Sequence, residues 1–239
     1  LMVDVTEREE RESLRREFTA NVSHELKTPL TSISGFAELM KEGLVEADKM
    51  REFAGDIYKG CGQLIALIDD IMKLSRLDEA AENEVAPESV DLYDLSQDIL
   101  ESLQPAAAKR SVSLHLEGEK QTILGVWRIL HEMVYNLCDN AIKYNKDGGS
   151  MTVQVTGEAE RVTLAVKDTG IGIPKGQQDR VFERFYRVDK SHSRRVGGTG
   201  LGLSIVKHGA QYHNALISLE SEPDVGTTIA IVFPRNMRP

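Results

Sequence analysis

The chain has 239 residues, of which 41% are hydrophobic and 28% charged, as is ordinary for a globular protein of one large domain or two smaller ones. Its net charge of −9 argues against nucleic acid as a partner, because no domain-wide basic surface is available to replace counterions. Two cysteines, both in apolar stretches of helical pattern, predict buried thiols and not a disulfide framework. No apolar run is long enough to span a bilayer.

Residues 1–17 predict the start of a charged helix that leads into the next segment. Thr6 and Glu9 have the spacing of a capping box, which would open a helix near Glu7. Oppositely charged residues follow at i,i+4, with the acid on the N-terminal side as helices prefer. Since the chain begins with Leu1 in place of an initiator methionine, we expect it to be a fragment of a longer protein.

Residues 18–42 predict a long helix with one apolar seam. Apolar residues recur in steps of four and three, the spacing of helices packed in a bundle, at Val22, Leu26, Pro29, Ile33, Phe36 and Met40. His24 lies midway between the first two and therefore on the outer face, with Thr28 one turn further along and Glu25 beside it. Pro29 removes a backbone donor and predicts a kink just after this site.

The first helix should end at Gly43, and a second helix is expected over about residues 48–77. Its apolar seam has the same steps, at Met50, Ala54, Ile57, Cys61, Leu64, Ile68 and Ile71. Further apolar residues widen this surface beyond the stripe that one partner needs, and a lone helical hairpin is too small to bury it. We therefore expect a homodimer that forms a four-helix bundle. Packing of the hairpin on the rest of its own chain is the alternative.

A polar, acidic stretch, residues 78–89, predicts a hinge, and the periodicity changes after it. Helices are expected over residues 92–109, with an interruption at Pro105, and over residues 127–144. Alternating apolar and polar residues predict strands at 112–116, 151–156, 162–167, 215–219 and 227–233. Helices that alternate with a mixed sheet make a two-layer α+β domain.

Polar residues on the helix over residues 127–144 suggest a phosphate and metal site. Asn136, Asn140 and Lys143 are spaced by four and three, so they project from one face. Two carboxamides and an ammonium on one face can hold a hydrated divalent ion and polyphosphate oxygens. A solvated polar face is the alternative for three such residues.

The segment DTGIGIP, residues 168–174, follows a predicted strand. The carboxylate of Asp168 can accept a hydrogen bond from the exocyclic amine of adenine, while Gly170 and Gly172 let the backbone approach a flat ring. An ordinary strand-to-loop turn uses the same residues, so this pattern is weak evidence by itself.

A basic stretch and a glycine-rich stretch complete the candidate site. Residues 175–195 carry seven basic side chains against three acidic ones, a local charge of +4 that suits a loop closing over phosphates, although an exposed basic loop is the alternative. The string GGTGLGLSIVK, residues 197–207, passes from glycine-rich backbone into a helix at about Leu201. It therefore presents amide hydrogens and a positive dipole end to phosphate.

These segments together resemble a known family. SHELKTPL, residues 23–30, is similar to the phosphoacceptor box of sensor histidine kinases of two-component systems. The four later segments resemble, in order, the asparagine, first glycine, phenylalanine and second glycine boxes of that family's ATP-binding domain, and DVGTT at residues 224–228 stands where its last glycine box is expected. The resemblance runs from about Arg16 to Phe233. The visible departures from the pattern are small, and Asn145 is one, because threonine or serine is frequent at its position.

The resemblance implies an all-α helical hairpin that forms a dimeric four-helix bundle, followed by an α+β two-layer sandwich of the GHKL (Bergerat) ATPase type. The expected domains are a signalling-helix linker, a dimerisation and histidine phosphotransfer domain, a hinge and a catalytic ATP-binding domain, at 1–17, 18–80, 81–88 and 89–236. Heat-shock chaperone ATPases, type II topoisomerases and mismatch-repair ATPases share the second fold but lack the SHELKTPL helix, so the combination favours the kinases.

The resemblance also implies a mechanism. His24 would take the γ-phosphoryl group of ATP with help from Glu25 and pass it to an aspartate of a response regulator, and Thr28 could place a water that dephosphorylates the regulator. The cofactors would be ATP and Mg²⁺, with the metal held by Asn136 and Asn140. The expected nucleotide-binding residues are Asn136, Asn140, Lys143, Tyr144, Asp168, Gly170, Gly172, Ile173, Tyr186, Arg187, Gly198, Thr199, Gly200, Leu201, Gly202, Leu203 and Thr227.

The expected partners are a second copy of the chain and a response regulator receiver domain. The resemblance further implies an upstream sensor, of PAS type, and membrane segments outside this sequence, so that the chain would be the cytoplasmic fragment of a protein in the bacterial cell membrane. Two other classes stay open. A nucleotide-gated dimeric phosphatase or signalling module would bind ATP without forming an acid-labile phosphate, and a GHKL ATPase would release phosphate without a phosphoenzyme.

Overall fold

The computed structural model describes residues 5–82, 86–189 and 198–235. The chain divides into two compact units, with the boundary between Met72 and Lys73. The first unit is a helical hairpin and the second an α+β domain, so the fold class predicted for each part is confirmed. None of the helices in the described part of the chain is both long and apolar enough to cross a membrane.

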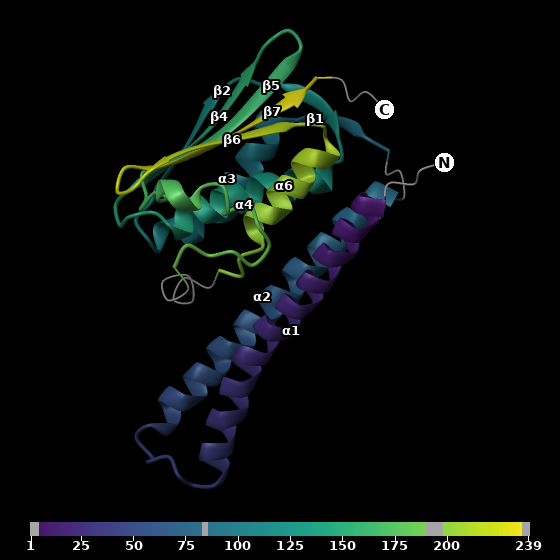
Figure 1. The fold of residues 1–239 in the computed structure, drawn as a ribbon. Helices are drawn as coiled ribbons and strands as arrows, with labels where there is room; N and C mark the ends of the chain where they lie inside the picture. The colour runs from purple at the N-terminus through teal and green to yellow at the C-terminus, as the bar shows by residue number, and fades with distance from the viewer. Residues whose placement is uncertain (1–4, 83–85, 190–197, 236–239) are drawn as a thin grey trace. The chain divides into compact units, whose positions relative to one another are not determined.

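Two long helices form the hairpin (Figure 1): α1 spans Val5–Lys41 and α2 spans Met50–Glu82. The side chains of the predicted capping box near the start of α1 lie outside the described residues. All six residues of the predicted α1 seam are half-buried, and the helix continues through Pro29. The second helix extends beyond the expected end at residue 77.

The predicted end of α1 at Gly43 is confirmed. Gly43 has a φ of 67° and donates its N–H to the carbonyl of Met40 at 3.2 Å, while the N–H of Leu44 reaches the carbonyl of Leu39 at 3.0 Å. These two bonds form a Schellman motif, which satisfies carbonyls that a helix end would otherwise leave open. A residue with a Cβ would be strained at this φ.

The apolar surface of α2 divides into two stripes. The stripe that faces α1 includes Phe53, whose ring lies 5.1 Å from that of Phe36, and Gly60, which lies against the side chain of Ile33. The predicted α2 seam is displaced from this stripe, because four of its members are exposed: Met50, Ala54, Cys61 and Ile68. The prediction that Cys61 is buried is therefore wrong, whereas Cys138 is fully buried.

The second unit carries three long helices and seven strands in its described residues. In chain order they are β1 (Glu88–Asp91), α3 (Leu92–Ala108), β2 (Ser113–Gly118), β3 (Thr122–Gly125), α4 (Trp127–Lys143), β4 (Ser150–Gly157), β5 (Arg161–Asp168), α6 (Gly202–Tyr212), β6 (Leu216–Glu222) and β7 (Gly226–Pro234). A short 3₁₀ helix spans Lys175–Gln177. Helices α3, α4 and α6 cover one face of the main sheet, which gives the two layers that the sequence predicted (Figure 1).

The main sheet has the strand order β2-β4-β5-β7-β6, and β1 pairs with β3 in a separate two-stranded sheet. The β2–β4 pair is parallel and the other pairs of the main sheet are antiparallel, so the sheet is mixed. In this register Asp168 at the end of β5 lies opposite Met151 near the start of β4. The end of β5 also lies beside the start of β7, where Lys167 pairs with Thr228.

Alternating residues of the central strands form the sheet's side of the core. Their buried members are Met151, Val153, Val155, Val162, Leu164, Val166, Ile229, Ile231 and Phe233. Two expectations about this unit are corrected. Strands β1 and β3 were not predicted from the sequence. Helix α3 is continuous through Pro105: the N–H of Lys109 still reaches its carbonyl at 3.4 Å, and the proline removes only the one bond that its own N–H would donate.

Candidate functional site

His24 lies on the solvent side of α1, with its side chain 80% exposed. The Nδ1 atom of the ring is 3.8 Å from Oε1 of Glu25, and the hydroxyl of Thr28 donates a hydrogen bond to the carbonyl of His24 at 3.2 Å. A carboxylate beside Nδ1 favours the tautomer that carries its proton there and leaves the lone pair on Nε2. The arrangement therefore presents an accessible nucleophilic nitrogen on a helix.

The two carboxamides of α4 lie against the start of α6. Asn136 is 9% exposed and donates its Nδ2 to the carbonyl of Glu132 at 2.7 Å, which aims Oδ1 away from its own helix. A Cβ added to Gly202 would lie 2.8 Å from Oδ1 of Asn136 and 3.4 Å from Nδ2 of Asn140. A side chain at position 202 would therefore fill the space in which these amides meet the glycine-rich turn.

Lys143 extends the same face of α4, but it has a partner that the sequence analysis did not identify. Its Nζ atom lies 2.7 Å from Oδ2 of Asp139, one turn earlier on the helix. The charge of Lys143 is thus partly balanced in this structure, although an ammonium group has three donors and can contact a phosphate while it keeps this partner. The i,i+4 spacing of the two residues is the sequence signal for this pair.

Asp168 ends β5 with one carboxylate oxygen fixed by the backbone. Its Oδ1 atom accepts hydrogen bonds from the N–H of Gly170 at 2.8 Å and from the N–H of Thr227 at 3.2 Å. Both of these hydrogen bonds, from described residues, go to Oδ1. Oδ2 is therefore the oxygen that can accept a hydrogen bond from an adenine amine. Burial raises the pKa of Asp168, and the two backbone hydrogen bonds offset part of this rise.

The loop after Asp168 is held between α4 and the β6–β7 hairpin. The N–H of Ile171 reaches the carbonyl of Tyr144 at 3.1 Å, and Gly170 lies so close to that carbonyl that a Cβ would be 2.3 Å from it. The N–H of Ile173 donates to the hydroxyl of Ser221 at 2.8 Å, and Gly172 lies against the backbone of Glu222. The predicted adenine loop is therefore fixed at both ends.

The phenylalanine segment, residues 182–187, is joined to the glycine-rich turn. The N–H of Phe185 reaches the carbonyl of Gly200 at 2.9 Å, and Nη2 of Arg187 donates to the carbonyl of Thr199 at 3.0 Å. The ring of Tyr186 lies under the guanidinium of Arg180 at 4.3 Å. The predicted basic residues Lys190, Arg194 and Arg195 lie outside the described residues.

The glycine-rich turn leads directly into α6. Gly200 has a φ of 77° and lies within contact of the Phe185 backbone, which explains the need for glycine there. The hydroxyl of Thr199 accepts from the N–H of Leu201 at 3.3 Å, and Leu201 itself is fully buried. No described side chain caps the N-terminus of α6, so its amide hydrogens can face an anion.

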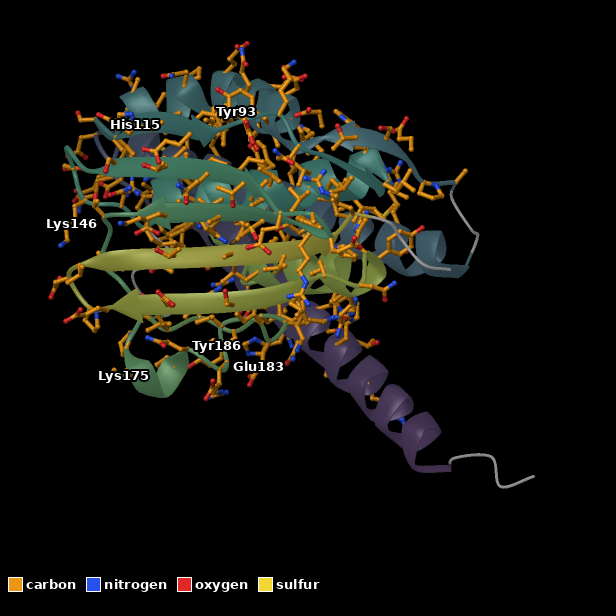
Figure 2. The ribbon with its side chains drawn as sticks, turned by 90° about the horizontal axis from the view of Figure 1, so that it is seen from above. Tyr93, His115, Lys146, Lys175, Glu183 and Tyr186 are labelled. Atoms are coloured by element: carbon orange, nitrogen blue, oxygen red, sulfur yellow. The ribbon has the colours of Figure 1, made fainter. Side chains whose placement is uncertain are left out.

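Local contacts join several of the predicted nucleotide residues in the region between α4, the start of α6 and the end of β5. Asn136 and Asn140 face the turn at Gly198–Leu203, and Asp168 with Thr227 marks the end of the sheet. Figure 2 looks onto the sheet and shows Lys146 at one end of it, with Lys175, Glu183 and Tyr186 beyond the β6 edge and His115 on the opposite, β2 side.

The carboxamides of α4 are the candidate ligands for a divalent ion in this region. The described residues contain no group of three or more His, Cys, Asp and Glu side chains placed to hold a metal. Carboxamide oxygens, together with phosphate oxygens and water, are suitable ligands for Mg²⁺, which usually keeps several waters. The Oδ1 atom of Asn136 beside the turn fits this requirement.

Three residues near this region were not assigned a role from the sequence: Asn145, Thr169 and Ser221. Asn145 was noted only as a departure from the family pattern, yet it is 9% exposed and bonds to Ala141, Lys146, Ser150 and Thr169. Ser221 links positions 48 residues apart through its bond to Ile173. An asparagine directly after the predicted helix was the signal that could have been used for the first, because asparagine side chains at helix ends often bond to the backbone.

Two family models match the chain. Residues 14–80 match the His Kinase A (phospho-acceptor) domain, and residues 125–237 match the Histidine kinase-, DNA gyrase B-, and HSP90-like ATPase. The first match contains His24, and the second contains Asn136, Asp168 and the turn before α6.

Curated proteins with similar sequences are sensor kinases. The chain is 38% identical over 232 residues to the sensor-like histidine kinase SenX3 of Mycolicibacterium smegmatis, which covers 97% of this chain and 60% of that protein. It is 34% identical over 247 residues to the sensor histidine kinase WalK of Bacillus subtilis, which covers 98% of this chain and 39% of that protein. The chain therefore spans less than two thirds of the length of these relatives.

Solved structures resemble the chain over most of its length. Full-length ShkA in complex with AMPPNP matches with a TM-score of 0.66 and 26% identity, over 93% of this chain and 46% of that one. The histidine kinase ThkA in complex with the response regulator protein TrrA matches with a TM-score of 0.76 and 22% identity, over 95% of this chain and 64% of that one, and supports the fold alone.

Proposed function

Because the chain belongs to the sensor histidine kinases, we propose that it transfers the γ-phosphoryl group of ATP to His24 and then to an aspartate of a response regulator. Its second unit contains the ATPase domain of this family, a domain that binds ATP. The observation that carries the proposal is an exposed histidine with a carboxylate beside Nδ1, in the same chain as an Asp168 carboxylate that the backbone of Gly170 holds at the end of β5. We propose the predicted division into linker, phosphotransfer domain, hinge and ATP-binding domain as well.

The main predicted nucleotide residues have defined tasks in this proposal. Asp168 accepts the adenine amine on Oδ2, because Oδ1 is engaged by the backbone of Gly170 and Thr227. The phosphates lie between the amide face of α4 and the amide hydrogens at the start of α6. Tyr144, Ile173 and Leu203 border this space through the adenine loop and the first turn of α6.

Mg²⁺ would be held by Asn136 and Asn140 and would neutralise charge on the phosphate oxygens. Arg187 is the lid cation of this proposal. Its bond to the carbonyl of Thr199 keeps the guanidinium at the turn that binds phosphate, so a short movement of the side chain brings it to the γ-phosphate. The ammonium of Lys143 contacts the phosphates, and its ion pair with Asp139 holds it on the same face of α4.

The transfer step needs a neutral imidazole at His24. The lone pair on Nε2 forms the bond to phosphorus, while the bond from phosphorus to the bridging oxygen breaks and its electron pair leaves with ADP. Glu25 orients the ring and accepts the Nδ1 proton as charge develops. A carboxylate of the regulator then takes the phosphoryl group and the histidine is regenerated. In the reverse task, the hydroxyl of Thr28 positions a water for dephosphorylation of the regulator.

We propose further that the hairpin forms a homodimer and that the whole protein is anchored in the bacterial membrane with a sensor upstream. Apolar side chains that stay exposed on the hairpin support the dimer: Leu30, Leu39, Met50, Ile65, Ile68 and Met72. If these side chains pack against the same residues of a second copy, the two hairpins form a four-helix bundle.

Incubation with γ-labelled ATP and Mg²⁺ tests this function. We expect an alkali-stable, acid-labile label on the wild type that is lost in His24→Ala and in Asn140→Ala. His115→Ala is the matched control, because His115 is also exposed but lies on β2 and should keep the label. Label that survives in His24→Ala would show that another residue is the phosphoacceptor.

Two further outcomes separate the remaining classes. ATP binding without any label would favour the nucleotide-gated phosphatase, and the next assay would compare regulator dephosphorylation by wild type and Thr28→Ala. Release of phosphate at a steady rate without a labelled chain would favour a GHKL ATPase.

A further inference from the structure

Asn145 forms a joint between α4 and the sheet. Its Nδ2 donates to the carbonyl of Ala141 at 3.0 Å and to the carbonyl of Ser150 at 3.0 Å. Its Oδ1 accepts from the N–H of Lys146 at 3.0 Å and from the hydroxyl of Thr169 at 3.3 Å. A carboxamide offers two donors and two acceptor sites, so every hydrogen-bonding position of this buried side chain is used.

The residues that Asn145 connects belong to the two halves of the nucleotide region. Ala141 is the next residue after Asn140, and Asn140 lies on the face that we assign to phosphate and metal. Thr169 is the next residue after Asp168, the adenine anchor. Ser150 is the first residue of β4, and its N–H donates to the hydroxyl of Thr169 at 2.9 Å. The network therefore connects the end of α4 with the end of β5 through the start of β4.

Two close approaches show how little free space this joint has. A Cβ at Gly149 would lie 2.2 Å from Oδ1 of Asn145 and 2.8 Å from the hydroxyl of Thr169. The neighbouring bond from Ile171 to the carbonyl of Tyr144 adds a second attachment between the same two segments. Side chains in such a packed network have few alternative positions.

We propose that Asn145 is a positioning residue that sets the spacing between the adenine anchor at Asp168 and the phosphate-binding face at Asn136 and Asn140. A nucleoside contacts only the first anchor, whereas ATP must reach both. Asn145 therefore controls the affinity for a nucleotide that carries phosphates and leaves the affinity for adenosine almost unchanged. The inference rests on the proposed nucleotide site and assigns this residue a role in it.

Two substitutions separate the contributions of the side chain. Asn145→Asp keeps the shape but removes both donors and places a carboxylate against the carbonyls of Ala141 and Ser150. Asn145→Thr keeps one donor, which can bond to only one of these carbonyls at a time. We expect Asn145→Asp to break the hydrogen-bonded connection between α4 and the sheet, and Asn145→Thr to weaken it in part.

Titration of the whole chain with adenosine and with ATP tests the proposal. Binding is monitored by NMR through the amide signals of Gly170 and Ile171. In Asn145→Asp we expect the Kd for ATP with Mg²⁺ to rise at least about tenfold, which corresponds to about 1.4 kcal/mol, and the Kd for adenosine to change less than about threefold. Asn145→Thr should give an intermediate rise for ATP. Gln154→Glu, an amide-to-acid change at an exposed position of β4, is the control and should leave both values unchanged.

The outcomes are distinguishable from failure of the proposed function. If the wild type binds no ATP, the proposed function is wrong. If the wild type binds ATP but the Kd values for ATP and adenosine rise by the same factor in the variants, Asn145 supports the fold alone and the inference is wrong. The inference is also wrong if neither Kd rises. Circular dichroism checks the fold of each variant, and if Asn145→Asp does not fold, the ratio of the two Kd values in Asn145→Thr decides.

Discussion

At the scale of single residues, Asp168 makes opposite demands on stability and binding. Burial raises its pKa, so the ionised carboxylate that we propose as the adenine anchor costs the folded state free energy above that raised pKa, and the cost disappears below the ordinary value of 3.8. Asp168→Asn keeps an oxygen for the N–H groups of Gly170 and Thr227 but offers the adenine amine a second donor. We expect the variant to be at least as stable as the wild type at pH 7.5, and to bind ATP about 10- to 100-fold more weakly.

Urea unfolding and ATP titration of the same samples check both parts of this expectation. Any stability advantage of Asp168→Asn should shrink as the pH falls toward 3.8, because the wild-type carboxyl becomes neutral there. A variant that loses stability at pH 7.5 and keeps its ATP affinity would contradict the role of Asp168 as the adenine anchor.

His213 gives the second prediction at this scale. Burial lowers its pKa, partly offset by its hydrogen bond to the carbonyl of Gly209, and its Nε2 accepts from the N–H of Val126 at 3.1 Å. The folded state needs the neutral ring, because a protonated Nε2 would face that N–H. Stability from His213 should be complete above pH 6.5 and should fall as the pH drops from 6.5 toward its lowered pKa.

Urea unfolding at several pH values between about 5 and 8, which bracket the ordinary histidine pKa, would measure this loss. His213→Gln keeps an acceptor and cannot titrate, so the loss of stability at acidic pH should be smaller than in the wild type. Equal pH dependence of the two proteins would assign the effect to other groups.

Sequence reasoning proposes roles for residues that share one face of a helix more readily than for residues whose partners are distant parts of the chain. The spacing of Asn136 and Asn140 predicts a shared face because a helix has a fixed period. Ser221 could not be connected to Ile173, nor Asn145 to Thr169, because these pairs meet only after the sheet and α4 have packed. Tertiary hydrogen bonds of this kind have no period in the sequence.

At the scale of elements, two glycines of α2 make a matched pair. A Cβ at Gly60 would lie 2.8 Å from Cγ1 of Ile33 on α1, whereas a Cβ at Gly62 would meet no described atom within 4 Å. Alanine in place of glycine favours a helix by about 1 kcal/mol, and overpacking costs about 1–3 kcal/mol. We expect Gly62→Ala to raise the melting temperature and Gly60→Ala to lower it or leave it unchanged.

Thermal unfolding followed by circular dichroism measures the pair directly. The two variants have the same gain in helix propensity, so their difference isolates the contact with Ile33. Equal stabilisation by both substitutions would mean that the helices separate easily at this point and that close packing there contributes little.

The same helix explains why some elements were predicted better than others. A long periodic pattern predicts that α2 exists, but its apolar surface contains two stripes, and the sequence does not say which one faces α1. Strands β1 and β3 have four residues each and pair with each other across α3 and β2, too short for alternation to be evident. The longer strands β4, β5 and β7 alternate between buried residues and residues that are half-buried or exposed, and they were predicted correctly.

At the scale of the whole molecule, the order of the motifs predicted the two units because each motif depends on a local pattern. The phosphoacceptor helix needs a bundle, and the asparagine and glycine segments need a sheet with helices on one face, so each identifies its own fold. The sequence cannot supply the relation between the units, because no local pattern encodes it. The oligomeric state belongs to the same level and calls for a direct test.

The hairpin provides that test, since two helices cannot bury the apolar side chains that α2 carries. Ile65 is 61% exposed and Ile68 is 50% exposed, and burial of such a side chain contributes about 1.5–3 kcal/mol. Ile65→Glu with Ile68→Glu should therefore raise the dimer Kd at least about 100-fold in sedimentation equilibrium. Leu216→Glu, at a residue 66% exposed on strand β6 of the sheet, is the control and should leave the Kd unchanged. Because both isoleucines already face solvent, the helical content of the double variant should persist, and an unchanged Kd would mean that a dimer, if formed, uses another surface.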